Sequence, residues 1–177
     1  MRRSQLLLPA TLIIMVLYCG ATSSVDTVDT VIESCNIARK HVDLDFCLSR
    51  LRSVPGSSSA DQRGHYFMAI DLAAVSAVMA WDTATRMAHG ESDPVVRDAL
   101  EACGYLYWAA SMPALRMYHG YAEVRNWGST ESLQFLIAQA GIGCDAALRG
   151  GGAAVGKMVT VNREFMQLST MADLLYD

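Results

Sequence analysis

This 177-residue chain contains five cysteines, and whether they form disulfides depends on the compartment in which the protein folds. Cys19 lies in an N-terminal stretch with the pattern of a secretory signal: basic Arg2 and Arg3, an apolar run over Leu6–Tyr18, then small residues. We expect residues 1–21 to be removed as a signal peptide. Four cysteines then remain, and an even number in an oxidising compartment predicts two disulfides in a secreted, extracellular protein. These cysteines are Cys35, Cys47, Cys103 and Cys144.

Other reactive side chains form no pattern that is typical of catalysis. The four histidines are far apart in sequence, and none has the spacing of a metal-binding pair. No phosphate-binding or serine-nucleophile motif occurs. The carboxylates of Asp71, Asp82 and Glu101 could pair for hydrolysis, but a solvated helix surface explains them better. We therefore expect no catalytic residue, metal or cofactor, and a binding protein rather than an enzyme.

Charge and length limit the partners and the architecture. The net charge of -4 becomes about -6 once Arg2 and Arg3 are removed, which disfavours nucleic acid and anionic membranes and suits a basic protein partner. The apolar run of the leader is too short to span a bilayer comfortably, and no later stretch approaches 18 consecutive apolar residues. We expect residues 22–177 to form one soluble, monomeric domain.

Apolar residues recur at helical spacing along most of the chain. Four long helices are predicted, over about residues 60–88, 93–121, 129–148 and 154–175. Gly90 is the predicted C-cap of the first, Asp93-Pro94 opens the second, and Pro113 predicts a kink within it. A shorter helical hairpin is predicted over residues 26–51. The expected fold is all-α: an antiparallel four-helix bundle with an N-terminal helical hairpin.

The helical pattern also bears on disulfide pairing. Cys103 and Cys144 both lie on apolar stripes of neighbouring predicted helices. Among the three possible connectivities, this favours a Cys103–Cys144 disulfide and a Cys35–Cys47 disulfide.

Aromatic residues near Cys103 suggest an interaction surface. If Tyr107 faces the core, the same helix cannot bury Tyr105 and Trp108 equally well, so one of them is expected to be available to a partner. The alternative is that the hairpin or the kink covers them, and that the polar residues nearby form an ordinary solvated face. The candidate interface residues are Tyr105, Trp108, Arg116, His119 and Glu123; Tyr118, Arg125 and Trp127 lie close to them in sequence.

The chain resembles the plant family of invertase and pectin methylesterase inhibitors. The segment Ala99–Tyr107, with Cys103 at its centre, looks like the family's Ala-Leu-x-x-Cys-x-x-Leu-Tyr core. Cys144-Asp145 loosely resembles the later Cys-x-Asp/Glu region, and Leu168–Leu174 resembles the final helix. The resemblance covers about residues 25–177. It implies a four-helix bundle with a hairpin and disulfides that join the first cysteine to the second and the third to the fourth.

The resemblance also implies a role in the plant cell wall. Members of the family block pectin methylesterase or acid invertase by docking on the enzyme. The Pro-Lys-Phe motif typical of invertase inhibitors is absent here, which favours pectin methylesterase as the partner and acid invertase as the alternative. A further alternative is a secreted bundle that shares the fold and has no enzyme target.

Overall fold

Helices make up most of the chain that the computed structural model describes, which is residues 29–149 and 151–176. No β-strand occurs within those residues. The predicted leader, residues 1–21, lies outside them. The elements in chain order are α1 (Thr30–Ala38), α2 (Leu44–Arg52), η2 (Ser57–Ser59), α3 (Gln62–Gly90), α4 (Pro94–Leu106), η3 (Tyr107–Ser111), α5 (Met112–Glu123), α6 (Trp127–Leu148), η4 (Gly152–Val155) and α7 (Gly156–Leu174).

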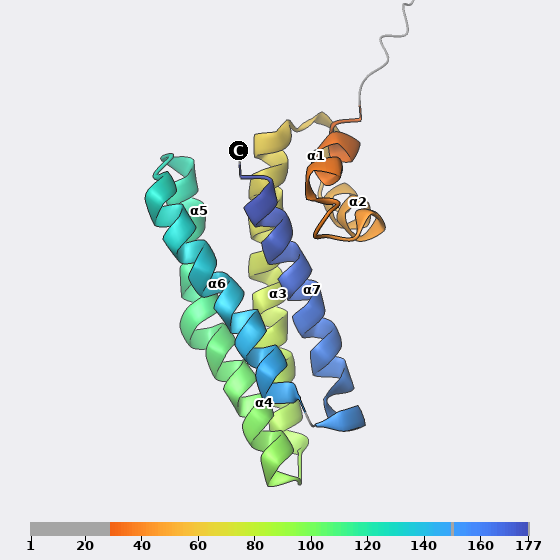
Figure 1. The fold of residues 1–177 in the computed structure, drawn as a ribbon, viewed down its shortest axis with the longest axis vertical. Helices are drawn as coiled ribbons and strands as arrows, with labels where there is room; N and C mark the ends of the chain where they lie inside the picture. The colour runs from red at the N-terminus through yellow and green to blue at the C-terminus, as the bar shows by residue number, and fades with distance from the viewer. Residues whose placement is uncertain (1–28, 150, 177) are drawn as a thin grey trace, which may run out of the picture.

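Four helical rods form the bundle that the sequence predicts (Figure 1). One rod consists of α4, η3 and α5, which follow one another along the same side of the bundle; the other three are α3, α6 and α7. Around the bundle, α3 packs against α4 and α5, these pack against α6, α6 packs against α7, and α7 packs against α3. The predicted all-α bundle with an N-terminal hairpin is confirmed.

Aspartates begin the first four α-helices. Asp29 accepts hydrogen bonds from two backbone N–H groups of α1, and Asp43 and Asp61 each accept one from α2 and α3. Asp93 caps α4, with Pro94 in its first turn, as the sequence predicts. Such caps satisfy N–H groups that have no partner within the helix and so fix where each helix begins.

Two disulfides cross-link the described residues, with the predicted pairing. Cys35–Cys47 joins the two helices of the hairpin, and Cys103–Cys144 joins α4 to α6 with a Cα–Cα distance of 4.5 Å. All four cysteines are fully buried. The two links are consistent with folding in an oxidising compartment.

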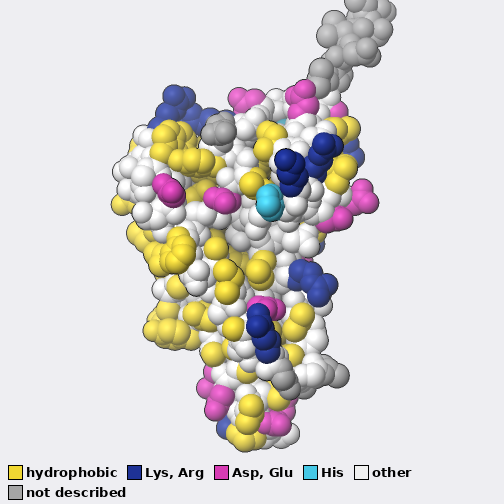
Figure 2. Space-filling view, in the orientation of Figure 1, with side chains coloured by type: hydrophobic (Ala, Val, Ile, Leu, Met, Phe, Trp, Pro, Cys, Tyr) yellow, Lys and Arg dark blue, Asp and Glu magenta, His cyan; other side chains and the backbone are white. Residues whose placement is uncertain are grey.

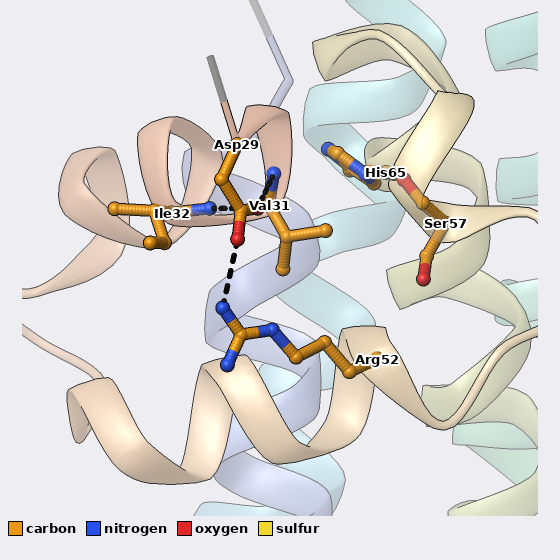
Figure 3. A network of polar contacts seen from close by, with 6 residues as sticks. All are labelled: Asp29, Val31, Ile32, Arg52, Ser57 and His65. Atoms are coloured by element: carbon orange, nitrogen blue, oxygen red, sulfur yellow. Dashed lines mark hydrogen bonds and ion pairs between the residues drawn. The ribbon is translucent and has the colours of Figure 1, made fainter. Parts of the chain in front are cut away.

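His65 at the start of α3 holds the hairpin against the bundle. Its imidazole is fully buried and lies 2.8 Å from the Ser34 hydroxyl of α1 and 2.7 Å from the carbonyl oxygen of Ser57. Within the hairpin, Asp29 accepts a 2.9 Å hydrogen bond from Arg52 (Figure 3). This bond, followed by the backbone N–H groups of α1, lowers the pKa of Asp29 below its ordinary value.

Several predicted boundaries need correction. Gly90 is the last residue of α3 and Glu91 is the C-cap, so the predicted cap is one residue early. The kink expected at Pro113 takes the form of a π-helical turn just before it, over Tyr107–Ser111. Because proline has no N–H, the widened turn lets the helix continue past a missing hydrogen bond. The last predicted helix begins at Gly156 rather than Ala154.

One helix carries an apolar face that the core does not use. Among the described residues, only α3 is long and apolar enough by composition to cross a membrane, although polar residues interrupt its apolar runs. In the bundle, α3 packs against α4, α5 and α7. Less than half of the most apolar 18-residue stretch of α3 is buried, and Val75, Val78 and Met79 are exposed.

Hydrophobic side chains also reach the surface on the side of the bundle that α5 and α6 form. Figure 2 shows them gathered over these helices. The exposed apolar residues of α6 include Phe135, Leu136 and Ile142. The bundle therefore has apolar surface on more than one side, and a binding site must be argued from its shape and its polar groups as well.

Candidate functional site

A groove runs between α3 and the α4–η3–α5 rod along the length of the bundle. Three cavities follow one another in it, each lined by α3 on one side and by α4, η3 or α5 on the other. We call this surface the α3/α5 groove. All five candidate interface residues, Tyr105, Trp108, Arg116, His119 and Glu123, are carried by the helical rod that forms its second wall.

Three large aromatic side chains surround the first cavity. Trp81 of α3, Tyr105 of α4 and Trp108 of η3 line a hollow of about 190 Å³. Their exposed fractions are 36%, 66% and 58%, and the rings of Tyr105 and Trp108 lie 6.5 Å apart. His89 and Glu101 border the same hollow. Exposed aromatic rings on a rigid helix are typical anchors of protein–protein interfaces.

Tyr107 explains why both neighbouring aromatics face outward. Its side chain is fully buried, with its ring 4.9 Å from the ring of Phe165 in an edge-on arrangement. Its hydroxyl donates a 2.6 Å hydrogen bond to Asn162 of α7. Burial raises the pKa of Tyr107 above its ordinary value. With Tyr107 fixed inward, Tyr105 and Trp108 both lie on the outer surface, and neither the hairpin nor the π-helical turn covers them.

The middle of the groove is apolar with one cation. Ala74 and Val78 of α3 face Met112 and Arg116 of α5 across a second hollow. The side chain of Arg116 is exposed, and it lines the third cavity as well. An aliphatic arginine stem can lie along such a surface while its charged head stays in water.

A histidine between two carboxylates marks the far end of the groove. His119 Nε2 lies 3.7 Å from Asp71 Oδ1, and His119 Nδ1 lies 3.7 Å from Glu123 Oε1. The centre of the His119 ring also lies 5.1 Å from the centre of the Phe67 ring. The three side chains are partly or largely exposed, so their mutual contacts contribute little to folding and the groups remain available to a partner.

The structure therefore places the predicted aromatic pair and the predicted polar residues on one surface, at different points along it. Sequence reasoning missed the opposite wall, above all Trp81 and Asp71. Helical spacing puts Trp81 in the apolar core stripe of α3, but the side chain is only partly buried. Two other aromatics near the predicted interface lie elsewhere: Tyr118 is buried, and Trp127 lies beyond the groove at the start of α6.

The polar groups of the groove are spread along its length. Within residues 29–149 and 151–176, no three histidine, cysteine, aspartate or glutamate side chains gather as a metal site would require. Of the carboxylates considered for hydrolysis, Asp82 pairs with Arg86, Asp71 pairs with His119, and Glu101 borders the aromatic hollow. They are divided among three different environments, and the shared feature of the groove is aromatic area with a charged margin.

Comparison with known proteins shows the fold and leaves the activity open. No protein-family model matches the sequence, and no curated protein matches it. Among solved structures, the chain is similar to a mutant form of a pectin methylesterase inhibitor from Arabidopsis, with a TM-score of 0.71. The match covers 81% of this chain and 95% of that one, at 14% sequence identity. The chain thus has the fold of that inhibitor, which is what the sequence resemblance implies.

Proposed function

We propose that this chain is a secreted inhibitor of pectin methylesterase that acts by docking, without a covalent step, over the substrate cleft of the enzyme. The α3/α5 groove is the surface that makes the contact. The observation that carries the proposal is the cluster of Trp81, Tyr105 and Trp108, three aromatic side chains that remain exposed on a disulfide-linked bundle.

The arrangement suits inhibition by obstruction. The aromatic residues sit on helices whose positions are fixed by the core, so little conformational entropy is lost when they are buried by a partner. Arg116 and the His119 cluster supply a polar margin of the kind that surrounds apolar interface centres. A rigid helical surface of this sort can cover an elongated cleft and exclude a polymeric substrate.

The fold supports the same class of function. The similar solved structure is named as a pectin methylesterase inhibitor, and a protein partner is the natural expectation for a fold of that kind. At 14% sequence identity, the similarity supports a shared fold but does not identify a target enzyme. The choice of pectin methylesterase as the partner is therefore part of the proposal.

A paired titration tests the proposal. Oxidised residues 22–177 are added to a plant pectin methylesterase and, separately, to an acid invertase at mildly acidic pH. We expect stoichiometric loss of methylesterase activity alone. Loss of invertase activity alone would support the alternative target within the same family resemblance. If a folded, disulfide-bonded sample slows neither enzyme, and a cell-wall extract yields no bound carbohydrate-active enzyme, the bundle is not an inhibitor of this type.

Variants at the groove test the surface. Truncating Trp108 to alanine is expected to raise the inhibition constant at least about tenfold, since exposed aromatic anchors contribute strongly to interfaces. Phe135→Ala is the matched control, because Phe135 is similarly exposed, at 64%, on α6, which forms neither wall of the groove. If the two variants lose inhibition equally, or if neither loses it, the groove is excluded as the contact surface.

A further inference from the structure

The C-terminus of α5 ends in a Schellman turn with an unusual residue at its key position. The N–H of Asn126 bonds to the carbonyl of Tyr121 at 2.9 Å, and the N–H of Arg125 bonds to the carbonyl of Ala122 at 3.2 Å. This pair of bonds requires a left-handed backbone at the residue after the cap, which is why glycine is common there. Here that residue is Arg125, with a φ angle of 57°.

Nothing in the turn itself calls for arginine. A left-handed conformation costs free energy for any residue with a Cβ, and glycine would avoid this cost. The apolar contact that often accompanies a Schellman turn would come from the following residue, which is the polar Asn126. The conformation of the turn therefore does not explain why Arg125 occupies this position, and we looked for a reason in its surroundings.

Arg125 is one of the residues that line a cavity at the end of the bundle. The cavity has a volume of about 260 Å³ and lies outside the α3/α5 groove cavities. Arg63 of α3 is a second arginine among the lining residues, and the ring centres of Trp127 and Tyr176 lie 4.9 Å apart in an edge-on arrangement. The cavity is lined by Arg63, Tyr66, Arg125, Trp127, Leu175 and Tyr176.

Its lining has a definite chemical character. Two arginines and no carboxylate side chain lie among the described lining residues, and the nearest acidic influence on the lining is that of Asp173 on Tyr66. Arg63 is only lightly engaged, through a 3.4 Å bond to the carbonyl of Glu123 and a position over the Phe67 ring. Guanidinium groups bind carboxylates through paired hydrogen bonds. Trp127 and Tyr176 add flat apolar surface beside them.

We propose that this cavity binds a small carboxylate carried on a six-membered ring. The carboxylate meets the guanidinium groups of Arg63 and Arg125, and the ring lies against the aromatic walls. The volume of about 260 Å³ admits a single ring with its substituents. Both an aromatic acid and a sugar acid have this chemistry. The cavity shares no lining residue with the three cavities of the α3/α5 groove, and the proposal does not require that the chain inhibit an enzyme.

Binding is measured by following the indole N–H signal of Trp127 in two-dimensional nuclear magnetic resonance spectra of residues 22–177. Benzoate and glucuronate are the two charged probes, benzamide and glucose are their neutral counterparts, and acetate lacks the ring. We expect saturable binding of benzoate, glucuronate or both, at least about tenfold tighter than the neutral counterpart and than acetate. Which of the two binds identifies the ring type. Binding of neither, or equal binding of charged and neutral probes, overturns the proposal.

Arg125→Gly separates binding from folding. Glycine suits the left-handed position, so the variant is expected to unfold at a temperature no lower than the parent, yet to bind the charged probe at least about tenfold more weakly. Arg63→Gln is expected to weaken binding to a similar extent. Arg86→Gln, on the exposed face of α3 and paired with Asp82, is the control and should bind as the parent does. A stable Arg125→Gly variant with undiminished binding would overturn the proposal.

Discussion

Among single residues, Tyr107 illustrates how a buried polar group specifies packing. Its hydroxyl donates to Asn162, and the Asn162 amide in turn donates a 3.1 Å hydrogen bond to the carbonyl of Gly141. The chain of contacts ties η3 to α7 and α6. Each member is buried, so a missing partner would leave an unsatisfied polar atom away from water.

Tyr107→Phe removes only the hydroxyl. The side-chain oxygen of Asn162 then loses its donor, and we expect the free energy of unfolding to fall by about 1–3 kcal/mol. Urea denaturation followed by circular dichroism measures this. Tyr105→Phe is the control, because Tyr105 is exposed and should change stability by less than about 0.5 kcal/mol. Equal effects of the two changes would mean that the buried network does not stabilise the fold.

Asp173, near the end of α7, is a carboxylate in an unfavourable place. Partial burial, and then the negative charge of Glu131, raise its pKa above the ordinary value. The folded protein thus holds this proton more tightly than the unfolded chain does. The stability that this group provides is fully present below the ordinary pKa of about 4, and is lost as the pH rises through the higher folded pKa.

Asp173→Asn should abolish this loss. At pH 7 the variant is expected to be more stable than the parent, by less than about 1 kcal/mol because solvent screens a partly exposed carboxylate. The difference should shrink as the pH is lowered to about 3.5, because the parent carboxyl takes up its proton in the folded state before the unfolded chain does. Urea midpoints at the two pH values provide the measurement. A variant that is less stable than the parent at pH 7 would contradict the argument.

Among the helices, glycines serve opposite purposes. Glycine is a poor helix former, but Gly141 and Gly143 near the end of α6 allow close packing. A Cβ at Gly141 would lie 2.7 Å from Met166 Cγ, and one at Gly143 would lie 2.9 Å from Leu106 Cδ1. Gly120 in α5 is different, because a Cβ there would meet nothing within 4 Å.

The two kinds of glycine predict changes of opposite sign. Gly120→Ala should stabilise the protein by about 0.5–1 kcal/mol, since alanine forms helix better than glycine and has open space at this site. Gly141→Val should destabilise it by about 1–3 kcal/mol through overpacking against α7. Thermal unfolding of both variants is the comparison. Stabilisation by Gly141→Val would show that the contact between α6 and α7 is looser than the structure indicates.

For the molecule as a whole, charge governs how a partner is approached. The chain has an excess of acidic over basic residues, and the groove adds Asp71, Glu101 and Glu123 near its two ends. A basic cell-wall enzyme would be drawn toward such a surface, mainly through a faster association rate. The aromatic contacts would then hold the complex.

Salt should therefore weaken inhibition. Between about 0.05 and 0.5 M sodium chloride, we expect the association rate with a basic pectin methylesterase to fall by about tenfold and the dissociation rate to change little. Surface plasmon resonance at a series of salt concentrations measures both rates. An association rate that does not respond to salt would exclude electrostatic attraction and leave the aromatic groove as the whole of the recognition.

Local signals in the chain are enough to establish the helical class, the hairpin, the capped start of α4 and the presence of two disulfides. These signals are apolar spacing of three and four residues, aspartate followed by proline, and an even number of cysteines behind a leader-like segment. They also indicate that Tyr105 and Trp108 cannot both share the core with Tyr107, because the three positions point in different directions around one helix.

Contacts between segments that are distant in the sequence determine which side chains come together to form the groove and the cavity. The two walls of the groove come from different helices, so no local pattern places Trp81 beside Tyr105 and Trp108. The same holds for the cavity that joins Arg63 to Arg125, and for the glycines whose missing Cβ atoms admit a neighbouring helix. Periodicity determines which face of a helix is apolar, but the packing of the helices decides which part of that face stays exposed.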